Sequence, residues 1–364
     1  MDKTREEKLA LLRLYFSQGL GKSYQRRLLE HFGSAHDAIH HPWPDVGVPQ
    51  NLEVKPHEEI IIQKAVSELE WLDENHCEIV SILDSNYPPL LRNIHGAPAL
   101  FFTRGNFRDW ENRIPIAFVG TRRATEYGKQ VVEKLISEMA GYPFVIVSGF
   151  ALGLDRFAHE AALKAGLPTI GVLGTGLQYI YPKENEDIFY KVLEKGLFIT
   201  EHARNALPHP GHFPDRNRLI SGVSQAVILV ETPEKSGALI TAEFALEQGR
   251  EVMAVPGSIF SPLHKGCHQM IQQGAKLVGS LRDILDELGL VDRSEEKEMQ
   301  DEVISVDLDE VEKNLFSKIT QEPLHIDKIT EISNLPPSSV AGNLTSLILK
   351  GLVQELPGKY FVKN

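Results

Sequence analysis

The chain has 364 residues, 42% hydrophobic and 24% charged, a composition that excludes disordered, collagen-like and coiled-coil proteins. Its length suits about two or three domains, and no run approaches the roughly 18–20 apolar residues of a membrane span. The formal net charge of -12 excludes a uniformly basic nucleic-acid-binding surface. The N-terminus lacks a signal-peptide pattern and the cysteines are too few for a disulfide framework, so we expect a cytoplasmic protein.

Residues 1–68 are expected to form a helical N-terminal domain. Two amphipathic runs flank Gly19-Leu20-Gly21, where glycine permits the positive φ of a tight turn between helices. The unit resembles a helix-hairpin-helix (SAM-like) motif, whose turn amides can hold a nucleic-acid phosphate. An ordinary αα-hairpin in a small bundle is the simpler interpretation, because a single short hairpin does not distinguish the two.

Residues 69–289 are expected to form an α/β domain. A lead-in strand at CEIVSILD precedes a region, residues 114–289, in which short apolar runs alternate with helical segments. This alternation predicts a Rossmann-like, doubly wound parallel sheet. The runs are continuously apolar, as is typical of strands that are buried on both faces.

The last part of the chain is expected to hold an acidic linker, 290–308, and a winged-helix domain, 309–364. The order of that domain is helix, helix, helix and then a hairpin. Its presumed recognition helix carries one base, Lys350, which is few for a DNA reader. A protein-contact or packing role is therefore at least as well supported as DNA reading.

The loops that follow the predicted strands favour a phosphate-binding site. Ligands of an open α/β sheet bind beyond the carboxyl ends of its strands. Glycine lets the backbone approach a phosphate, and a following helix N-terminus offers free N–H groups and a positive dipole. Ser236-Gly237 opens a helical segment in this way, with Thr241 one turn inside it. Positive charge would come from bases in the same loops: Arg122, Lys183, Arg216 and Arg218.

Other chemistries are not favoured. No G-x-G-x-x-G follows the first strand of the alternating region and no G-x-x-x-x-G-K-[ST] occurs, which disfavours dinucleotide and P-loop sites. His209 and His212 stand in a Pro-Gly loop without helical geometry or cysteines to complete a metal site. Asp155 and His159, one helical turn apart, are more simply a helix-start carboxylate and its neighbour than an acid–base pair. We therefore expect no catalytic residue, no cofactor and no metal.

Several ordered motifs carry a resemblance to a known family. The chain resembles the DprA (Smf) DNA-processing proteins over about residues 114–289, and helical N-terminal and winged-helix C-terminal appendages also occur in that family. The motifs, in order, are VGTRRATEYG, SGFALGLDRFAHEAAL, GTGLQYIYPKEN, FPDRNRLISG, SGALITAEFALEQGREVMAVPG and GCHQMIQQGAKLV.

The resemblance implies a protein that binds single-stranded DNA, protects incoming DNA during natural transformation and helps to load the RecA recombinase for homologous recombination. It also implies a homodimer formed through the Rossmann-like domain. Turn amides and the Arg and Lys side chains would hold phosphates, so that binding would tolerate any sequence. Unpaired nucleobases could stack on Phe150, Tyr181 or Phe213. Carried over by motif, the DNA site would comprise Gly120, Thr121, Arg122, Ser148, Gly149, Phe150, Lys183, Arg216, Asn217, Arg218, Ser236, Gly237 and Thr241.

One departure and one alternative accompany the resemblance. The family usually has Asn where this chain has His268, in an expected loop before the last helix, and imidazole can still donate a hydrogen bond. The alternative is a nucleotide-processing enzyme of the lysine-decarboxylase-like (phosphoribohydrolase) class, which shares this Rossmann variant. Such enzymes need a PGGxGTxxE-type motif, whereas SGALITAEFA has Glu243 but no double glycine.

Overall fold

The structure, a computed structural model, divides into two compact units, Met1–Leu290 and Val291–Asn364. The predicted acidic linker lies, beyond Leu290, outside the residues that the structure describes. Those residues are 4–43, 47, 55–107, 109, 112–290, 309–320, 323–333, 335–350, 352–356 and 358–363.

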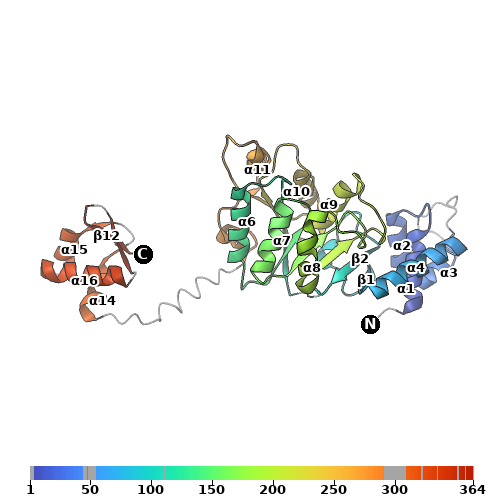
Figure 1. The fold of residues 1–364 in the computed structure, drawn as a ribbon, viewed down its shortest axis with the longest axis horizontal. Coiled ribbons are helices and arrows are strands. Elements are labelled where there is room, and N and C mark those ends of the chain that lie inside the picture. The colour runs from blue at the N-terminus through green and yellow to red at the C-terminus, as the bar shows by residue number, and fades with distance from the viewer. Residues whose placement is uncertain are drawn as a thin grey trace. The chain divides into compact units, whose positions relative to one another are not determined.

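In the described residues, the N-terminal part of the first unit is built from four helices (Figure 1): α1 (Arg5–Phe16), α2 (Lys22–Phe32), α3 (Ala35–His40) and α4 (Glu59–Glu74). The Thr4 hydroxyl caps α1 by accepting from the Glu7 N–H at 3.2 Å. The Glu7 carboxylate accepts in turn from the Ala35 N–H, at the start of α3, at 2.6 Å. Gly19, with φ of 79°, turns the chain between α1 and α2, so the predicted helical hairpin is present.

A nine-stranded sheet forms the centre of the first unit, in the order β1-β2-β6-β5-β4-β3-β7-β8-β9. All pairs from β6 to β9 are parallel, which confirms the predicted doubly wound sheet. The lead-in is an antiparallel pair, β1 with β2, and β2 joins β6 antiparallel at one edge. The strands are β1 (Cys77–Ser81), β2 (Leu100–Gly105), β3 (Ile114–Gly120), β4 (Phe144–Ser148), β5 (Thr169–Val172), β6 (Leu197–Thr200), β7 (Ala226–Val230), β8 (Glu251–Ala254) and β9 (Lys276–Leu277).

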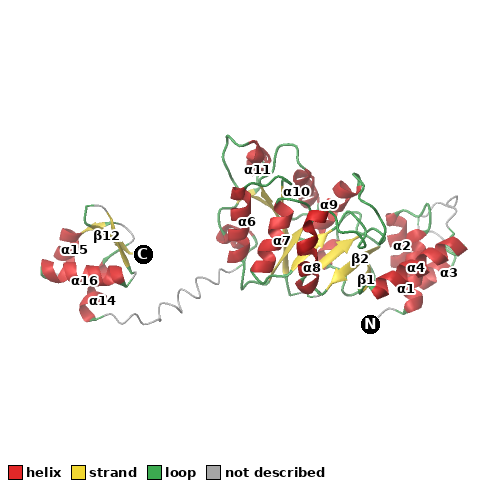
Figure 2. Cartoon of the chain, viewed as in Figure 1, coloured by secondary structure: helices red, strands yellow, loops and turns green. Residues whose placement is uncertain are grey.

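Helices cover the sheet (Figure 2). Successive residues of β3 belong to different cores, since Phe118 packs in the core that contains α6 and α7 and Val119 in the core that contains α9 and α10. None of the described helices is long and apolar enough to cross a bilayer. The helical segments are α5 (Pro89–Arg92), α6 (Glu126–Glu138), α7 (Leu154–Lys164), η1 (Lys183–Asn185), α8 (Glu186–Lys195), α9 (His212–Gly222), α10 (Gly237–Glu247), η2 (Pro262–His264), α11 (Lys265–Gln272) and α12 (Leu281–Glu287).

The second unit has the predicted winged-helix order. Helices α14 (Glu310–Lys318), α15 (Ile326–Ser333) and α16 (Pro337–Leu349) pack with a sheet of order β10-β12-β11, formed by Leu324–His325, Tyr360–Lys363 and Val353–Leu356. The Lys350 ammonium lies 2.6 and 2.7 Å from the two Glu312 carboxylate oxygens. Lys350, the single cation predicted for the recognition helix, is therefore paired with a carboxylate of its own domain.

Candidate nucleic-acid interface

The carboxyl ends of the parallel strands open onto a cavity of about 570 Å³. A smaller hollow of about 70 Å³ adjoins it, because Arg122, Tyr181, Phe213 and Arg216 line both. Strand ends and helix starts bring most of the predicted site together here. The predicted residues that line one or both hollows are Gly120, Thr121, Arg122, Gly149, Phe150, Arg216, Asn217, Ser236, Gly237 and Thr241.

The N-terminus of α10 faces this cavity. The Ser236 hydroxyl caps the helix by accepting from the Ala238 N–H at 3.2 Å. The Asn217 side-chain amide donates to the Gly237 carbonyl at 3.0 Å and holds the first turn in place. Gly237 is exposed, and a Cβ there would meet no atom within 4 Å. Its bare backbone therefore faces the cavity rather than another part of the protein, as a phosphate ligand requires.

The N-terminus of α6, by contrast, is already occupied by a carboxylate. The Thr125 N–H donates to Glu231 Oε2 at 2.8 Å, and the Thr125 hydroxyl donates to Glu231 Oε1. Glu231 is only 1% exposed. This is the helix start that follows the first strand of the alternating region, where dinucleotide-binding folds place a pyrophosphate. The α6 N-terminus is therefore not free to hold a phosphate, in keeping with the missing G-x-G-x-x-G, whereas the α10 N-terminus opens into the cavity.

Arg216 positions the loops at the floor of the cavity. Arg216 is 6% exposed, and its guanidinium donates hydrogen bonds to the carbonyls of Gly149 and Val172. These bonds join the ends of β4 and β5. Burial lowers the pKa of Arg216 to about 10, although the neighbouring Asp155 carboxylate favours the charged form. Burial likewise raises the pKa of Asp155. The predicted cation is thus a buried structural group that lines the cavity, and Asp155, which the sequence suggested only as a helix-start carboxylate, is its partner.

An exposed cation and two aromatic rings form the accessible side of the cavity. The Arg122 guanidinium carbon lies 5.7 Å from the centre of the Phe213 ring. The Tyr181 ring lies 5.7 Å from the Phe213 ring, tilted by 34°. Phe150 does not join them, because its ring is 1% exposed and packs 4.8 Å from Phe198. Phe150 lines the smaller hollow, but a ring buried to this degree offers no face to a base, so the structure favours a packing role for it over stacking.

Three further predicted residues lie outside the cavity. Ser148 is fully buried, and its hydroxyl donates to the Phe118 carbonyl at 2.7 Å. Lys183 is exposed at the start of η1 and lines neither hollow. Arg218 is 8% exposed and forms an ion pair with the Glu201 carboxylate. The structure therefore does not bring these three side chains to the site that the family motifs predicted.

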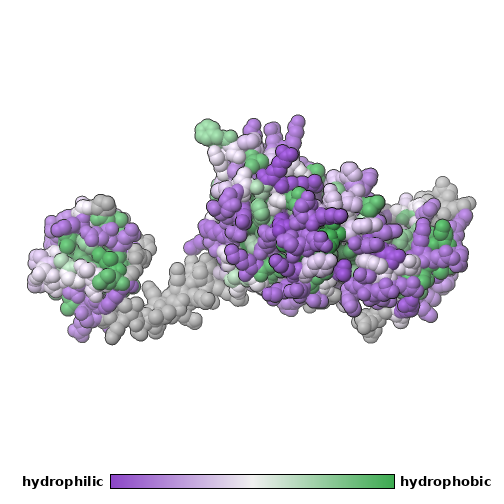
Figure 3. Space-filling view, in the orientation of Figure 1, coloured by the Kyte–Doolittle hydropathy of each residue, from purple (hydrophilic) through white to green (hydrophobic). Residues whose placement is uncertain are grey.

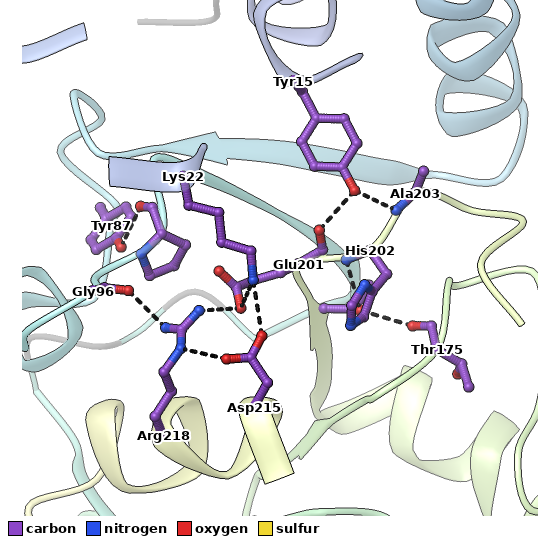
Figure 4. Close-up of polar contacts among 12 residues, drawn as sticks. Tyr15, Lys22, Tyr87, Gly96, Thr175, Glu201, His202, Ala203, Asp215 and Arg218 are labelled. Atoms are coloured by element: carbon purple, nitrogen blue, oxygen red, sulfur yellow. Dashed lines mark hydrogen bonds and ion pairs between the residues drawn. The ribbon is translucent and has the colours of Figure 1, made fainter. Parts of the chain in front are cut away.

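Arg218 belongs to a group of charges, the Glu201 cluster, that comprises Lys22, Glu201, Asp215 and Arg218 (Figure 4). Lys22 lies 3.2 Å from Glu201 and 3.1 Å from Asp215. The Tyr15 hydroxyl donates to the Glu201 carbonyl at 3.0 Å. Lys22 directly follows the Gly19-Leu20-Gly21 turn, so the cation best placed to help that turn hold a phosphate is paired with two carboxylates. This placement favours the ordinary hairpin, docked on the α/β domain.

The structure places His268 differently from the sequence prediction and also locates the histidine pair His209 and His212. His268 stands within α11 and not in a loop, and its Nε2 lies 3.0 Å from the Gly257 carbonyl oxygen, outside both hollows. The rings of His209 and His212 are 5.1 Å apart. Within the described part of the chain, no three His, Cys, Asp or Glu side chains gather as metal ligands.

Family models match two parts of the chain. The model for DNA recombination-mediator protein A matches residues 78–289, and the DprA winged helix domain matches residues 301–359. DNA processing protein DprA of Bacillus subtilis is 46% identical over 215 residues, covering 59% of this chain and 72% of that protein. Protein Smf of Synechocystis is 32% identical over 383 residues, covering 95% and 96%.

Two solved structures agree with these matches. DNA processing protein A of Streptococcus pneumoniae superposes with a TM-score of 0.65 at 36% identity, over 79% of this chain and 99% of that one. The Helicobacter pylori protein, solved to explain its single-stranded DNA binding mode, superposes with a TM-score of 0.53 at 28% identity, over 58% and 95%. A family model over more than half of the sequence, and a relative matched along almost its whole length, show that the chain belongs to the DprA/Smf family of DNA-processing proteins.

Proposed function

We propose that the cavity at the carboxyl edge of the sheet binds single-stranded DNA. The observation that carries this is one cavity faced by the α10 N-terminus, the exposed Arg122 and the Tyr181–Phe213 pair. A helix N-terminus and a guanidinium suit phosphates, and aromatic faces suit unpaired bases, whose stacking does not depend on sequence. The solved Helicobacter pylori relative, described by its single-stranded DNA binding mode, supports the same ligand class.

Single strands are favoured over duplex DNA by the kind of contacts available. The Tyr181 and Phe213 rings can stack only on a base that is not already paired and stacked in a helix. The net charge of -12 gives no long-range attraction to a duplex backbone. Affinity therefore rests on the local contacts of the cavity, which a flexible single strand can reach.

In the cell, the protein would act in natural transformation. It would protect incoming single strands in the cytoplasm and help to load the RecA recombinase for homologous recombination, without a catalytic step of its own. A homodimer through the Rossmann-like domain is supported by β9, which pairs only with β8 in the described part of the chain and exposes 47% of Leu277. Sedimentation of a Leu277→Lys variant as monomers at micromolar concentration would support this interface, and an unchanged dimer would place it elsewhere.

The enzyme alternative is not favoured by the geometry. Glu243, the carboxylate of the weak phosphoribohydrolase-like motif, is exposed on α10 and lines neither hollow. A glutamate that acts on a bound nucleotide has to reach the reacting atoms. Release of the base from AMP by the full chain would show that this assignment is wrong.

The decisive experiment compares binding of single- and double-stranded oligonucleotides over a range of salt concentrations. Each phosphate that a Lys or Arg side chain neutralises contributes about -0.7 to the slope of log affinity against log salt concentration for single strands. Arg122→Ala should weaken binding to all sequences alike and flatten the slope by about 0.7. The control is Lys164→Ala, an exposed cation in the last turn of α7 and hence at the opposite edge of the sheet. Equal slopes for Arg122→Ala and the unaltered protein would move the site away from this edge.

Lys183 is tested in the same assay. It stands two residues after Tyr181, exposed and outside the cavity, so it is proposed to contact a phosphate at the rim. Lys183→Arg, which keeps the charge, should retain more affinity than Lys183→Glu. Equal affinities of the two variants would remove Lys183 from the interface.

A further inference from the structure

The loop between β8 and η2 presents an apolar tip to solvent. Phe260 is 91% exposed and Ile259 is 76% exposed. Figure 3 shows pale green, apolar atoms projecting from the larger unit close to where Figure 1 places α11. Residues 255–261 are named the Phe260 loop. A large aromatic side chain held almost wholly in water gains nothing from burial within the fold, so it points to a contact with something else.

This loop lies on the same edge of the sheet as the cavity. β8 is the neighbour of β7, and β7 is the neighbour of β3. Strands are about 4.8 Å apart, so the end of β8 stands about 5 Å from that of β7 and about 10 Å from that of β3. Arg122 and Ser236, which line the cavity, lie in the loops that follow β3 and β7. The distance between the two surfaces is thus one that a few nucleotides can span.

Hydrogen bonds join the loops of this edge into one surface. The Tyr127 hydroxyl, at the start of α6, donates to the Pro256 carbonyl at 2.8 Å. The Gly266 N–H, at the start of α11, donates to the Thr232 carbonyl at 2.8 Å, in the loop that leads to α10. The His268 ring, 3.0 Å from the Gly257 carbonyl oxygen, fixes the base of the loop. Phe260 is therefore presented from an anchored loop, which lowers the entropy lost on binding.

The exposed charges around the Phe260 loop indicate what kind of partner it contacts. Arg123, Lys235 and Lys265 are exposed cations on these same loops, and no ion pair holds any of them in the part of the chain described. The exposed carboxylates of these loop ends are Glu126 and Glu234, so the surface is locally positive although the chain is not. An aromatic tip among unpaired cations matches the combination of stacking and phosphate contact that single strands need. A two-fold contact between copies would instead bring these like charges together.

We propose that the single strand runs from the cavity across the ends of β7 and β8 and that one of its bases stacks on Phe260. The proposal rests on the proposed function and adds a second contact surface to it. The cavity would hold the backbone and nearby bases, and the Phe260 loop would engage a base further along the strand. Short oligonucleotides should then need only the cavity, whereas longer ones should gain affinity from both surfaces.

The test measures binding of thymidine oligonucleotides of about 5 and about 20 nucleotides by fluorescence anisotropy, lengths chosen around the site sizes of single-strand grooves. Phe260→Ala should weaken binding of the long oligonucleotide about five- to tenfold, the lower end of the range for one stacked base, and leave the short one unchanged. Phe260→Tyr should restore the loss, and the salt slope should stay the same because no charge is removed. Since Phe260 is 91% exposed, folding should not be affected.

The control is Leu246→Ala, another exposed apolar residue, 55% exposed, in the last turn of α10. Unchanged long-oligonucleotide affinity in Phe260→Ala, with Arg122→Ala still weakening both lengths, would overturn this proposal alone. A loss of dimer in Phe260→Ala during sedimentation would overturn it in favour of a contact between copies. Failure of the unaltered protein to bind either oligonucleotide would overturn the proposed function as well.

Discussion

Arg218→Ala should destabilise the protein strongly and leave the ionic part of DNA binding intact. Glu201 is 5% exposed, its Oε1 has no hydrogen-bond partner, and its Oε2 is held by Arg218 and Lys22. Without Arg218, a buried carboxylate would keep only Lys22, whose side chain is 48% exposed. Removing one partner of a buried ion pair costs about 3–5 kcal/mol, and Arg218 also loses its bond to the Gly96 carbonyl at 2.8 Å. Lys22→Ala, at the exposed end of the Glu201 cluster, should cost at most about 1 kcal/mol.

Urea unfolding followed by tryptophan fluorescence measures both changes, since Trp43 and Trp71 lie in the first unit. The double variant Glu201→Gln with Arg218→Met should recover most of the loss, because it leaves no buried charge unpaired. The salt slope for single-stranded DNA should equal that of the unaltered protein in Arg218→Ala. A stability within about 1 kcal/mol of the original, together with a slope flattened by about 0.7, would refute the reasoning and make Arg218 a phosphate ligand.

Three further predictions concern a buried histidine, two glycines that line the cavity, and the winged-helix domain. His159 is fully buried and its pKa is lowered to about 3, so the unfolded chain takes up a proton below about pH 6.5 that the folded chain does not. Stability should therefore fall by nearly 1.4 kcal/mol per pH unit once the pH is a unit or more below that value. The His159→Gln variant should lose about this share of the slope in urea titrations at pH 5.5 and 4.5. Gly237→Ala should lower DNA affinity without lowering the melting temperature. Gly120→Ala should lower both, because its Cβ would collide with the Val230 carbonyl. Equal losses of affinity and melting temperature in the two variants would contradict the close approach of DNA to α10. Deletion of 309–364 should leave single-strand affinity within about tenfold, and a larger loss would make the winged helix a primary DNA reader.

The sheet and the edge that carries the cavity were predictable because their signal is local. Continuous apolar runs such as residues 144–148 can only be strands buried on both faces, and parallel strands leave their carboxyl-end loops on one edge. Gly120 and Ser236-Gly237 could be assigned to the cavity for that reason. Their roles depend on the backbone, which the sequence pattern determines directly.

The roles of individual charged side chains were less predictable, because they depend on partners far away in sequence. Arg216 and Arg218 stand in one motif, yet one turns towards Asp155 and lines the cavity while the other turns towards Glu201, and nothing in FPDRNR distinguishes them. Phe150 was one of three stacking candidates that the sequence could not tell apart, and its ring is buried while its backbone has a φ of 57°. Glu231, two residues before a Pro-Glu-Lys turn, gave no sign that it caps a helix 106 residues earlier in the chain.

The Glu231 carboxylate occupies the N-terminus of α6, the position where dinucleotide-binding folds hold the pyrophosphate of their ligand. A soluble phosphate compound could reach the α6 N-terminus only by displacing a side chain that is tethered, buried and held by two hydrogen bonds from Thr125. These hydrogen bonds hold the loop that carries Arg122 in its conformation without a bound nucleotide. The shape of this end of the sheet is therefore set by the folded chain itself and does not depend on a bound nucleotide.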